Sequence, residues 1–285
     1  MIIRKAGRRA IVLLAAFGFG FSAAASGHAA IIGLFANGTY VDISPPPGGE
    51  EKNMKASLEA LGHTVNEFTG ITDTDWNNAF AANDFVFIAD QELGSLFPDL
   101  SAAARTAIQN NVSAGQGFIL HGNIGNYDID LLNGLFGFTV ANGGNYSSAE
   151  IMTKGVDAAG TAYSDDPATI PGNNGTYALT TASLPLGAKK IYTIGTDTTV
   201  ALLPYGGGNI AFLGWDWYKS NPPTAAGSGG QDGGWQQVLQ SSVQEAAGGV
   251  PEPSSLLLLG GVLAGAAGWR GRKGRRSSSS GRSPA

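Results

Sequence analysis

Cysteine is absent from all 285 residues of this chain, and its absence sets the first limits on the chemistry. Without a thiol the protein has no disulfide, no cysteine-ligated metal, no cysteine nucleophile and no lipid anchor on an N-terminal cysteine. Basic residues are scarce between Ala30 and Gly249, where 7 Lys and Arg stand against 21 Asp and Glu, a net charge near −14. Because so acidic a domain repels phosphate backbones, we expect no nucleic-acid partner.

The missing basic residues lie at the two ends of the chain. Four of them precede Ala10, and they are followed by an apolar run to Phe21 and by small residues to Ala30. This order predicts a secretory signal peptide over residues 1–30 and export through the Sec machinery. Residues 31–247 then form one domain, which is long enough to bury a hydrophobic core.

A long hydrophobic run is also lacking. The apolar stretch Leu256 to Trp269 has 14 residues, four of them Gly, and falls short of the ~20 residues of a stable membrane-spanning helix. Basic residues between Arg270 and Arg276 would hold its C-terminal side in the cytoplasm. We expect a short helix that anchors the chain transiently in the inner membrane, with the middle domain outside.

The order Pro251-Glu252-Pro253, short apolar helix and Arg-rich end over residues 250–276 resembles the PEP-CTERM sorting signal of Gram-negative bacteria. The resemblance implies that Pro251, Glu252 and Pro253 are recognised by exosortase, a membrane-embedded protease that removes the tail. It also implies delivery to the cell surface or to an exopolysaccharide matrix. The alternative is a permanent C-terminal anchor. Residues 277–285 are expected to be a disordered tail.

In the middle domain, short apolar strands alternate with amphipathic helices, which favours βα units around a mostly parallel sheet flanked by helices. The expected strands are Ile31–Ala36, His63–Phe68, Asp84–Asp90, Gly117–His121, Ile191–Ile194, Val200–Pro204 and Asn209–Trp215. The expected helices are Glu50–Leu61, Asp75–Ala82, one between the cap Ser101 and the stop Gly115, Asp128–Phe136 and a last one from Trp235. Residues 139–188, rich in Gly, Asn, Ser and Thr, are expected to be irregular loops with at most short strands.

Two stretches resemble the ThuA-like branch of the class I glutamine amidotransferase-like fold. "GQGFILHGNIGNYDIDLLNGLFGFTV", residues 115–140, is similar to its strand, turn and helix, and "GGGNIAFLGWDW", residues 206–217, to a late strand. The resemblance implies an α/β, flavodoxin-like fold for residues 31–247. In that family a nucleophilic cysteine follows the strand that here ends at His121, and this chain has Gly122 and Asn123 there. Amidotransferase chemistry is therefore excluded.

Polar and aromatic residues follow the expected strands at their C-terminal ends, where open α/β sheets bind ligands. The candidate ligand-binding residues are Asp90, Glu92, His121, Asn123, Trp215, Asp216 and Trp217. Carboxylates with a histidine suit acid/base hydrolysis, and tryptophans stack on sugar rings. The structural alternatives are capping carboxylates, a hydrogen-bonded structural histidine and tryptophans that pack in the core.

No cofactor and no metal site are expected. The pairs Asp73/Asp75 and Asp128/Asp130 lack the Gly-bent, oxygen-rich loop of a calcium site and are explained by acidic helix N-termini. Three functions fit these observations. The leading one is a non-catalytic module that binds extracellular polysaccharide, the second is a secreted carbohydrate-active hydrolase using the Asp, Glu and His candidates, and the third is a scaffold without a small ligand.

Overall fold

The computed structural model describes residues 29–46, 48–123, 125–147, 149–172, 175–218 and 233–248. The predicted signal peptide, the sorting signal with its short apolar helix and the tail after residue 276 lie outside the described residues. Among those residues, no helix combines the length and the apolar character needed to cross a bilayer.

The expected strands and helices of the α/β domain are confirmed, with boundaries that shift by one to three residues. The strands are β1 (Ile31–Phe35), β2 (Thr64–Phe68), β3 (Phe85–Ile88), β4 (Gly117–His121), β5 (Asn142–Tyr146), β6 (Ile151–Lys154), β7 (Thr169–Pro171), β8 (Thr176–Thr180), β9 (Lys189–Ile194), β10 (Asp197–Tyr205) and β11 (Gly208–Leu213). The helices are α1 (Glu50–Ala60), α2 (Asp73–Ala82), α3 (Ala102–Ser113), α4 (Tyr127–Phe136) and α5 (Trp235–Ala246). Residues 139–188 contribute four short strands, β5 to β8.

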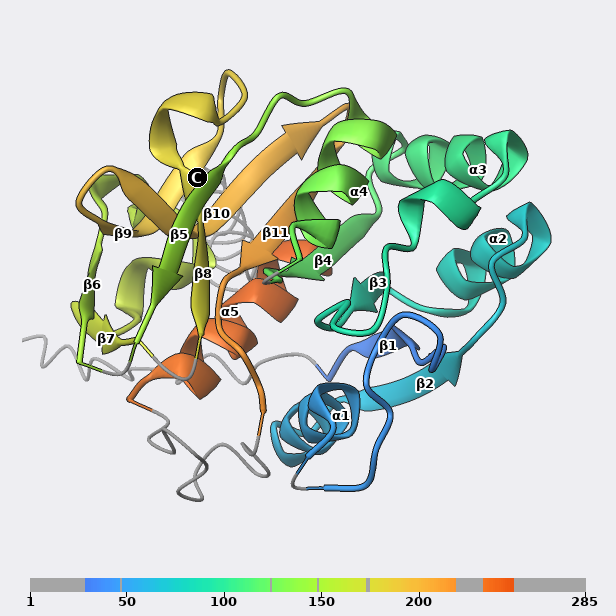
Figure 1. The fold of residues 1–285 in the computed structure, drawn as a ribbon, viewed down its shortest axis with the longest axis horizontal. Coiled ribbons are helices and arrows are strands. Elements are labelled where there is room, and N and C mark those ends of the chain that lie inside the picture. Colours follow the sequence, from blue (N-terminus) through green and yellow to red (C-terminus); the bar gives the residue numbers. More distant parts are fainter. Residues whose placement is uncertain are drawn as a thin grey trace, which may run out of the picture.

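One twisted sheet runs through the domain in the order β2-β1-β3-β4-β11-β10-β9-β6-β7, from the right of Figure 1 to its left, and β8 and β5 branch from β10. The strands from β2 to β11 are parallel, whereas β10, β9, β6 and β7 pair antiparallel. The expectation of a mostly parallel sheet is therefore right for one half only. Two-residue turns join β9 to β10 and β10 to β11, and such hairpins force antiparallel pairing.

Helices cover both faces of the parallel half. Trp76 of α2, Ile108 of α3 and Leu131 of α4 belong to one hydrophobic cluster, and Met54 of α1 and Val238 of α5 to the other. Neighbouring strand residues alternate between the two clusters because successive side chains of a strand point to opposite faces. Burial on both faces explains why these strands appear in the sequence as continuous apolar runs.

The strand order has a topological switch point at the C-terminal ends of β1 and β3, which we call the crevice. The chain leaves β1 through α1 toward β2 on one side, and it leaves β3 through α3 toward β4 on the other side. The order of the strands therefore reverses between β1 and β3. Open α/β sheets bind their ligands at such a point.

Candidate functional site

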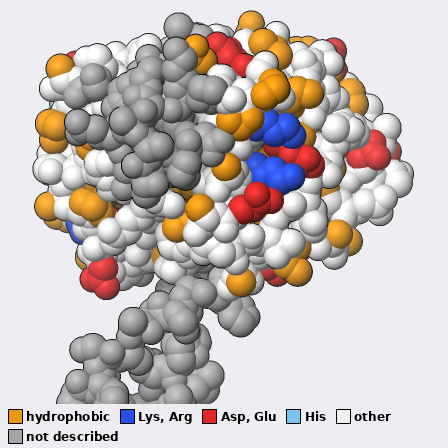
Figure 2. Space-filling model, turned by 90° about the horizontal axis from the view of Figure 1, so that it is seen from below, with side chains coloured by type: hydrophobic (Ala, Val, Ile, Leu, Met, Phe, Trp, Pro, Cys, Tyr) orange, Lys and Arg blue, Asp and Glu red, His pale blue; other side chains and the backbone are white. Residues whose placement is uncertain are grey.

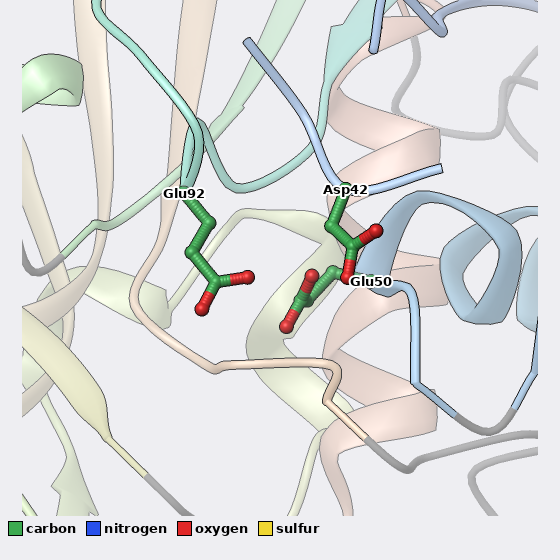
Figure 3. Close-up of side chains that lie close together, drawn as sticks. All are labelled: Asp42, Glu50 and Glu92. Carbon is green, nitrogen blue, oxygen red and sulfur yellow. The ribbon is translucent and has the colours of Figure 1, made fainter. Parts of the chain in front are cut away.

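Three carboxylates from three separate segments meet at this crevice. Asp42 lies in the loop after β1, Glu50 is the first residue of α1, and Glu92 lies in the loop after β3. One carboxylate oxygen of each residue lies within 4.8 Å of the other two. Figure 3 shows the Glu50 carboxylate between those of Asp42 and Glu92. The crevice is therefore lined with acidic oxygens.

Hydrogen bonds to backbone groups hold the two loops in place. The Leu93 amide donates to the Tyr40 carbonyl at 3.0 Å, which ties the loop of Glu92 to the loop of Asp42. The Asp42 carboxylate accepts from the Ser44 amide at 2.8 Å. A Cβ at Gly49 would lie 2.3 Å from the Ser44 carbonyl oxygen, so only glycine allows the loop to fold back onto the start of α1.

Glu50 is the most buried member of this group. Only 2% of Glu50 is exposed, and its Oε2 atom has no hydrogen-bond partner. The pKa of Glu50 is raised to about 9, chiefly by burial; the bond from its own backbone amide opposes the shift, and the negative charges of Glu92, Asp216 and Asp90 add to it. Glu92 is exposed, so two neighbouring carboxyl groups have different surroundings.

Asp90 and Asn123, two candidates from the sequence, are brought together. The Asn123 side-chain amide donates to Asp90 Oδ1 at 2.5 Å, and Asn123 Oδ1 accepts from the Gly125 amide at 2.5 Å. Burial raises the pKa of Asp90 well above its usual range, the bond from Asn123 opposes this, and Asp216 adds to it. The loops after β3 and β4 are thus joined at the edge of the crevice.

Asp216, which follows β11, and Tyr177, on β8 in the antiparallel half, lie close to each other at the strand ends. Asp216 is 8% exposed and accepts from the Tyr218 amide at 2.7 Å. Tyr177, on β8, has its pKa raised by burial and then by Asp216, Asp90 and Glu92. A Cβ at Gly175 would lie 2.8 Å from the Tyr177 hydroxyl and 3.4 Å from Asp216 Oδ2, so both groups border the same space.

Among the residues that the structure describes, no Lys or Arg forms an ion pair with Asp42, Glu50 or Glu92. The ion pairs among the described residues join Lys52 and Lys55 to Glu67, Lys52 to Glu51, and Lys190 to Asp157. Figure 2 shows blue basic atoms directly beside red acidic atoms on the face seen from below. Lys52, Lys55 and Lys190 are therefore engaged in ion pairs with other carboxylates.

His121, Trp215 and Trp217 lie in the core. His121 is fully buried between Phe87 and Trp217, at ring-centre distances of 5.2 Å and 5.0 Å, and neither ring nitrogen has a hydrogen-bond partner. Burial lowers the pKa of His121 to about 3, so this ring stays neutral at ordinary pH and is unsuited to proton transfer.

Trp215 and Trp217 are 1% and 0% exposed, and Trp215 stacks on Trp235 at 5.4 Å. The Trp217 indole donates to Ser57 Oγ at 2.9 Å. Stacking on a sugar needs a free ring face, and neither ring has one. Both tryptophans are core residues, as the structural alternative predicted.

Three residues of the crevice were missed in the sequence: Asp42, Glu50 and Tyr177. The signal for Glu50 was present, because it begins the expected helix directly after a Gly-containing loop that follows the first strand. Asp42 lies in the same loop. Tyr177 could not have been found, since it comes from the Gly- and Asn-rich segment whose pairing with the rest of the sheet is set by distant residues.

Comparison with known proteins bears on the C-terminal end. Residues 249–273 match the PEP-CTERM protein-sorting motif. The chain carries this motif. It was predicted from Pro251, Glu252 and Pro253 with the apolar and basic segments that follow. The PEP-CTERM motif implies processing by an exosortase and export to the cell envelope. No curated protein matches the chain.

Solved structures of similar fold have low sequence identity. A ThuA-like protein of Bacteroides uniformis is 9% identical with a TM-score of 0.49, and the match covers 79% of this chain and 93% of that chain. One of Parabacteroides merdae is 13% identical with a TM-score of 0.49 and coverages of 78% and 92%. A cytoplasmic protein of Salmonella typhimurium is 13% identical with a TM-score of 0.48 and coverages of 74% and 98%. Similarity of this degree gives no information about activity.

Proposed function

We propose that this protein is exported through the Sec machinery, held briefly in the inner membrane by its short apolar stretch, and released by exosortase at the cell surface or into the extracellular matrix. The PEP-CTERM motif over residues 249–273 supports this course. Intact-mass spectrometry of protein from the native envelope and medium tests it. A species that ends near Pro251 to Ser255 is expected, and a membrane-bound species that retains Arg276 would show a permanent anchor instead.

For the domain itself, we propose a non-catalytic binding module whose ligand is an extracellular polysaccharide held at the acidic crevice. The supporting observation is the convergence of Glu92, Asp216 and the Tyr177 hydroxyl at the strand ends. Carboxylates accept hydrogen bonds from sugar hydroxyls, and a tyrosine hydroxyl both donates and accepts. The net charge near −14 favours a neutral or amino polysaccharide over an acidic one.

Retention on matrix polysaccharide tests the binding proposal. The full chain is passed over polysaccharide isolated from the producing cells, beside Tyr177→Phe and the control Tyr205→Phe. Tyr205 lies at the β10–β11 turn, at the opposite end of β10 from its pairing with β8. We expect Tyr177→Phe to bind about tenfold more weakly, which is the effect of losing roughly one hydrogen bond to a ligand. Equal retention of the two variants would contradict the proposal.

A second candidate, a secreted glycoside hydrolase, is favoured by one observation. Oxygens of Glu50 and Glu92 lie within 4.8 Å, and one carboxyl is buried while the other is exposed. Retaining glycosidases use two carboxyl groups about 5–5.5 Å apart, with surroundings that separate their pKa values. Glu50 would then be the acid and Glu92 the nucleophile.

Turnover of a panel of aryl glycosides distinguishes the two candidates. A hydrolase should release the aryl group, and Glu50→Gln should lower kcat by a factor of about 10²–10⁴, the usual contribution of a general acid. If the unmodified protein turns over no glycoside but is retained on polysaccharide, the hydrolase is excluded and the binding module is supported.

A further inference from the structure

We propose that Asp42, Glu50 and Glu92 form a calcium site at the crevice between the loops that follow β1 and β3. The three carboxylates come from two loops and a helix N-terminus, separated by up to 50 residues of chain, and their oxygens approach within 4.8 Å (Figure 3). The site goes beyond the proposed function, because it needs no polysaccharide to form.

The spacing of the oxygens fits one Ca²⁺ ion. Calcium binds oxygen at about 2.4 Å, so two oxygens on opposite sides of the ion lie ~4.8 Å apart. The oxygens of Asp42, Glu50 and Glu92 meet this upper limit for every pair. Three oxygens within 4.8 Å of one another have a common point no more than ~2.8 Å from each, so small side-chain adjustments suffice for one ion to contact all three at the 2.3–2.6 Å typical of calcium. Solvent can supply further ligands on the side of the exposed Glu92.

A second observation points to a ligand at this place. Glu50 is 98% buried, since only 2% of it is exposed, and its Oε2 atom has no hydrogen-bond partner. Its carboxylate points between the other two (Figure 3). A buried carboxylate oxygen without a donor is costly, and the carboxylates of Asp42 and Glu92 within 4.8 Å add negative charge beside it. A cation satisfies this oxygen and screens the repulsion among the carboxylates.

Calcium fits better than magnesium or zinc. Magnesium requires oxygens at about 2.1 Å in a near-octahedral shell, which limits opposite ligands to ~4.2 Å, and it gives up water reluctantly. Zinc prefers nitrogen and sulfur ligands, and the three side chains here offer oxygen only. An exported domain meets calcium at concentrations that suit extracellular sites, with a Kd on the order of 10⁻⁴–10⁻³ M.

Calcium titration of the full chain tests the site. The protein is stripped with EGTA and titrated with CaCl₂ by calorimetry, and its Tm is measured with and without 10 mM CaCl₂. We expect one ion per chain, a Kd on the order of 10⁻⁴–10⁻³ M and a Tm rise of about 3–6 °C. Glu92→Gln and Asp42→Asn should weaken binding at least tenfold and reduce the Tm rise to below about 1 °C.

Glu59→Gln is the matched control, because it removes one exposed carboxylate from α1, at the other end of the helix from Glu50. It should bind calcium like the unmodified protein. Since Glu92 is exposed, Glu92→Gln is expected to fold, and its Tm without calcium verifies this. Three results would overturn the proposal: a Tm that does not change with calcium, an equal Tm rise in Glu92→Gln and Glu59→Gln, or magnesium binding as tight as calcium binding.

Discussion

Asn123 donates its side-chain amide to Asp90 at 2.5 Å, and this bond joins the loop after β4 to the end of β3. Asn123 Oδ1 accepts from the Gly125 backbone amide, so the orientation of the Asn123 side chain is determined. Both residues were candidates in the sequence. The pair positions a buried carboxyl at the rim of the acidic crevice.

Replacing Asn123 with Leu should destabilise the protein by about 1–3 kcal/mol, because a buried acceptor loses its donor. Asn123→Asp should cost more at pH 7 than at pH 4, since two carboxylates then face each other and protonation relieves their repulsion. Urea denaturation at the two pH values measures both effects. The exposed Asn145→Asp is the control and should change little. An Asn123→Asp penalty that is the same at both pH values would argue against direct contact with Asp90.

His121→Leu should leave stability unchanged or raise it by about 1–2 kcal/mol, because two buried nitrogens without partners are replaced by an apolar side chain. His63 offers the contrasting case. Its Nδ1 accepts from the Ala30 amide at 3.1 Å, and its Nε2 pairs with Gln240 at 3.0 Å. His63→Leu should therefore destabilise by about 1–3 kcal/mol. Thermal denaturation of both variants checks this, and equal losses would mean that the His121 ring is bonded.

Trp217→Phe separates a core role from a ligand-binding role. The change removes the indole donor to Ser57, whose hydroxyl still donates to the Asn53 carbonyl at 2.7 Å. We expect a loss of about 1–3 kcal/mol in the free energy of unfolding, from the bond and the smaller ring, with unchanged retention on polysaccharide. Weaker retention at full stability would restore the sugar-stacking hypothesis for this position.

Asp166 gives the stability a pH dependence that can be measured away from the crevice. It is 5% exposed and accepts from Ser241 Oγ at 2.7 Å. Burial raises the pKa of Asp166 from 3.8 to about 6, against the effects of Ser241 and Lys154. The folded protein therefore holds this proton more tightly than the unfolded chain does. The contribution of Asp166 to the free energy of unfolding is complete below about pH 4 and is lost as the pH rises to about 6.

Relative to Asp166→Asn, the unmodified protein should lose up to about 3 kcal/mol of stability between pH 4 and pH 6. Chemical denaturation across this range compares the two proteins. Asp165→Asn, a change at the exposed neighbour, should follow the unmodified profile. A constant difference between Asp166→Asn and the unmodified protein at every pH would mean that the Asp166 pKa is not raised.

Local patterns were enough to predict the order of most strands and helices. The cap at Ser101 is one example: its hydroxyl accepts from the Ala104 amide at 3.1 Å, as the position of Ser before an amphipathic stretch indicated. The apolar run Phe85–Ile88 is another, since it is buried throughout. These features depend on neighbours in the chain, and therefore the sequence alone reveals them.

The antiparallel half of the sheet and the composition of the site could not be predicted in this way. Two-residue turns fix the pairing of β10 with β9 and β11, but the pairing of β8 with β10 and β5 joins segments without such a turn. Trp217 alternates with Trp215 as a binding pair would, yet both are buried by α5 and by Ser57 of α1. A periodic pattern identifies a face of a strand without revealing what will cover it.

The sequence by itself determined the destination of this protein and the absence of thiol chemistry, because the sorting motif and the missing cysteine require no folding to be recognised. Only the tertiary structure decided the site. Asp42, Glu50 and Glu92 are spread over 50 residues and meet because β1 and β3 lie side by side and their following loops are tied by the Leu93–Tyr40 bond. Charge repulsion opposes that meeting, and the packing of the sheet and its helices imposes it.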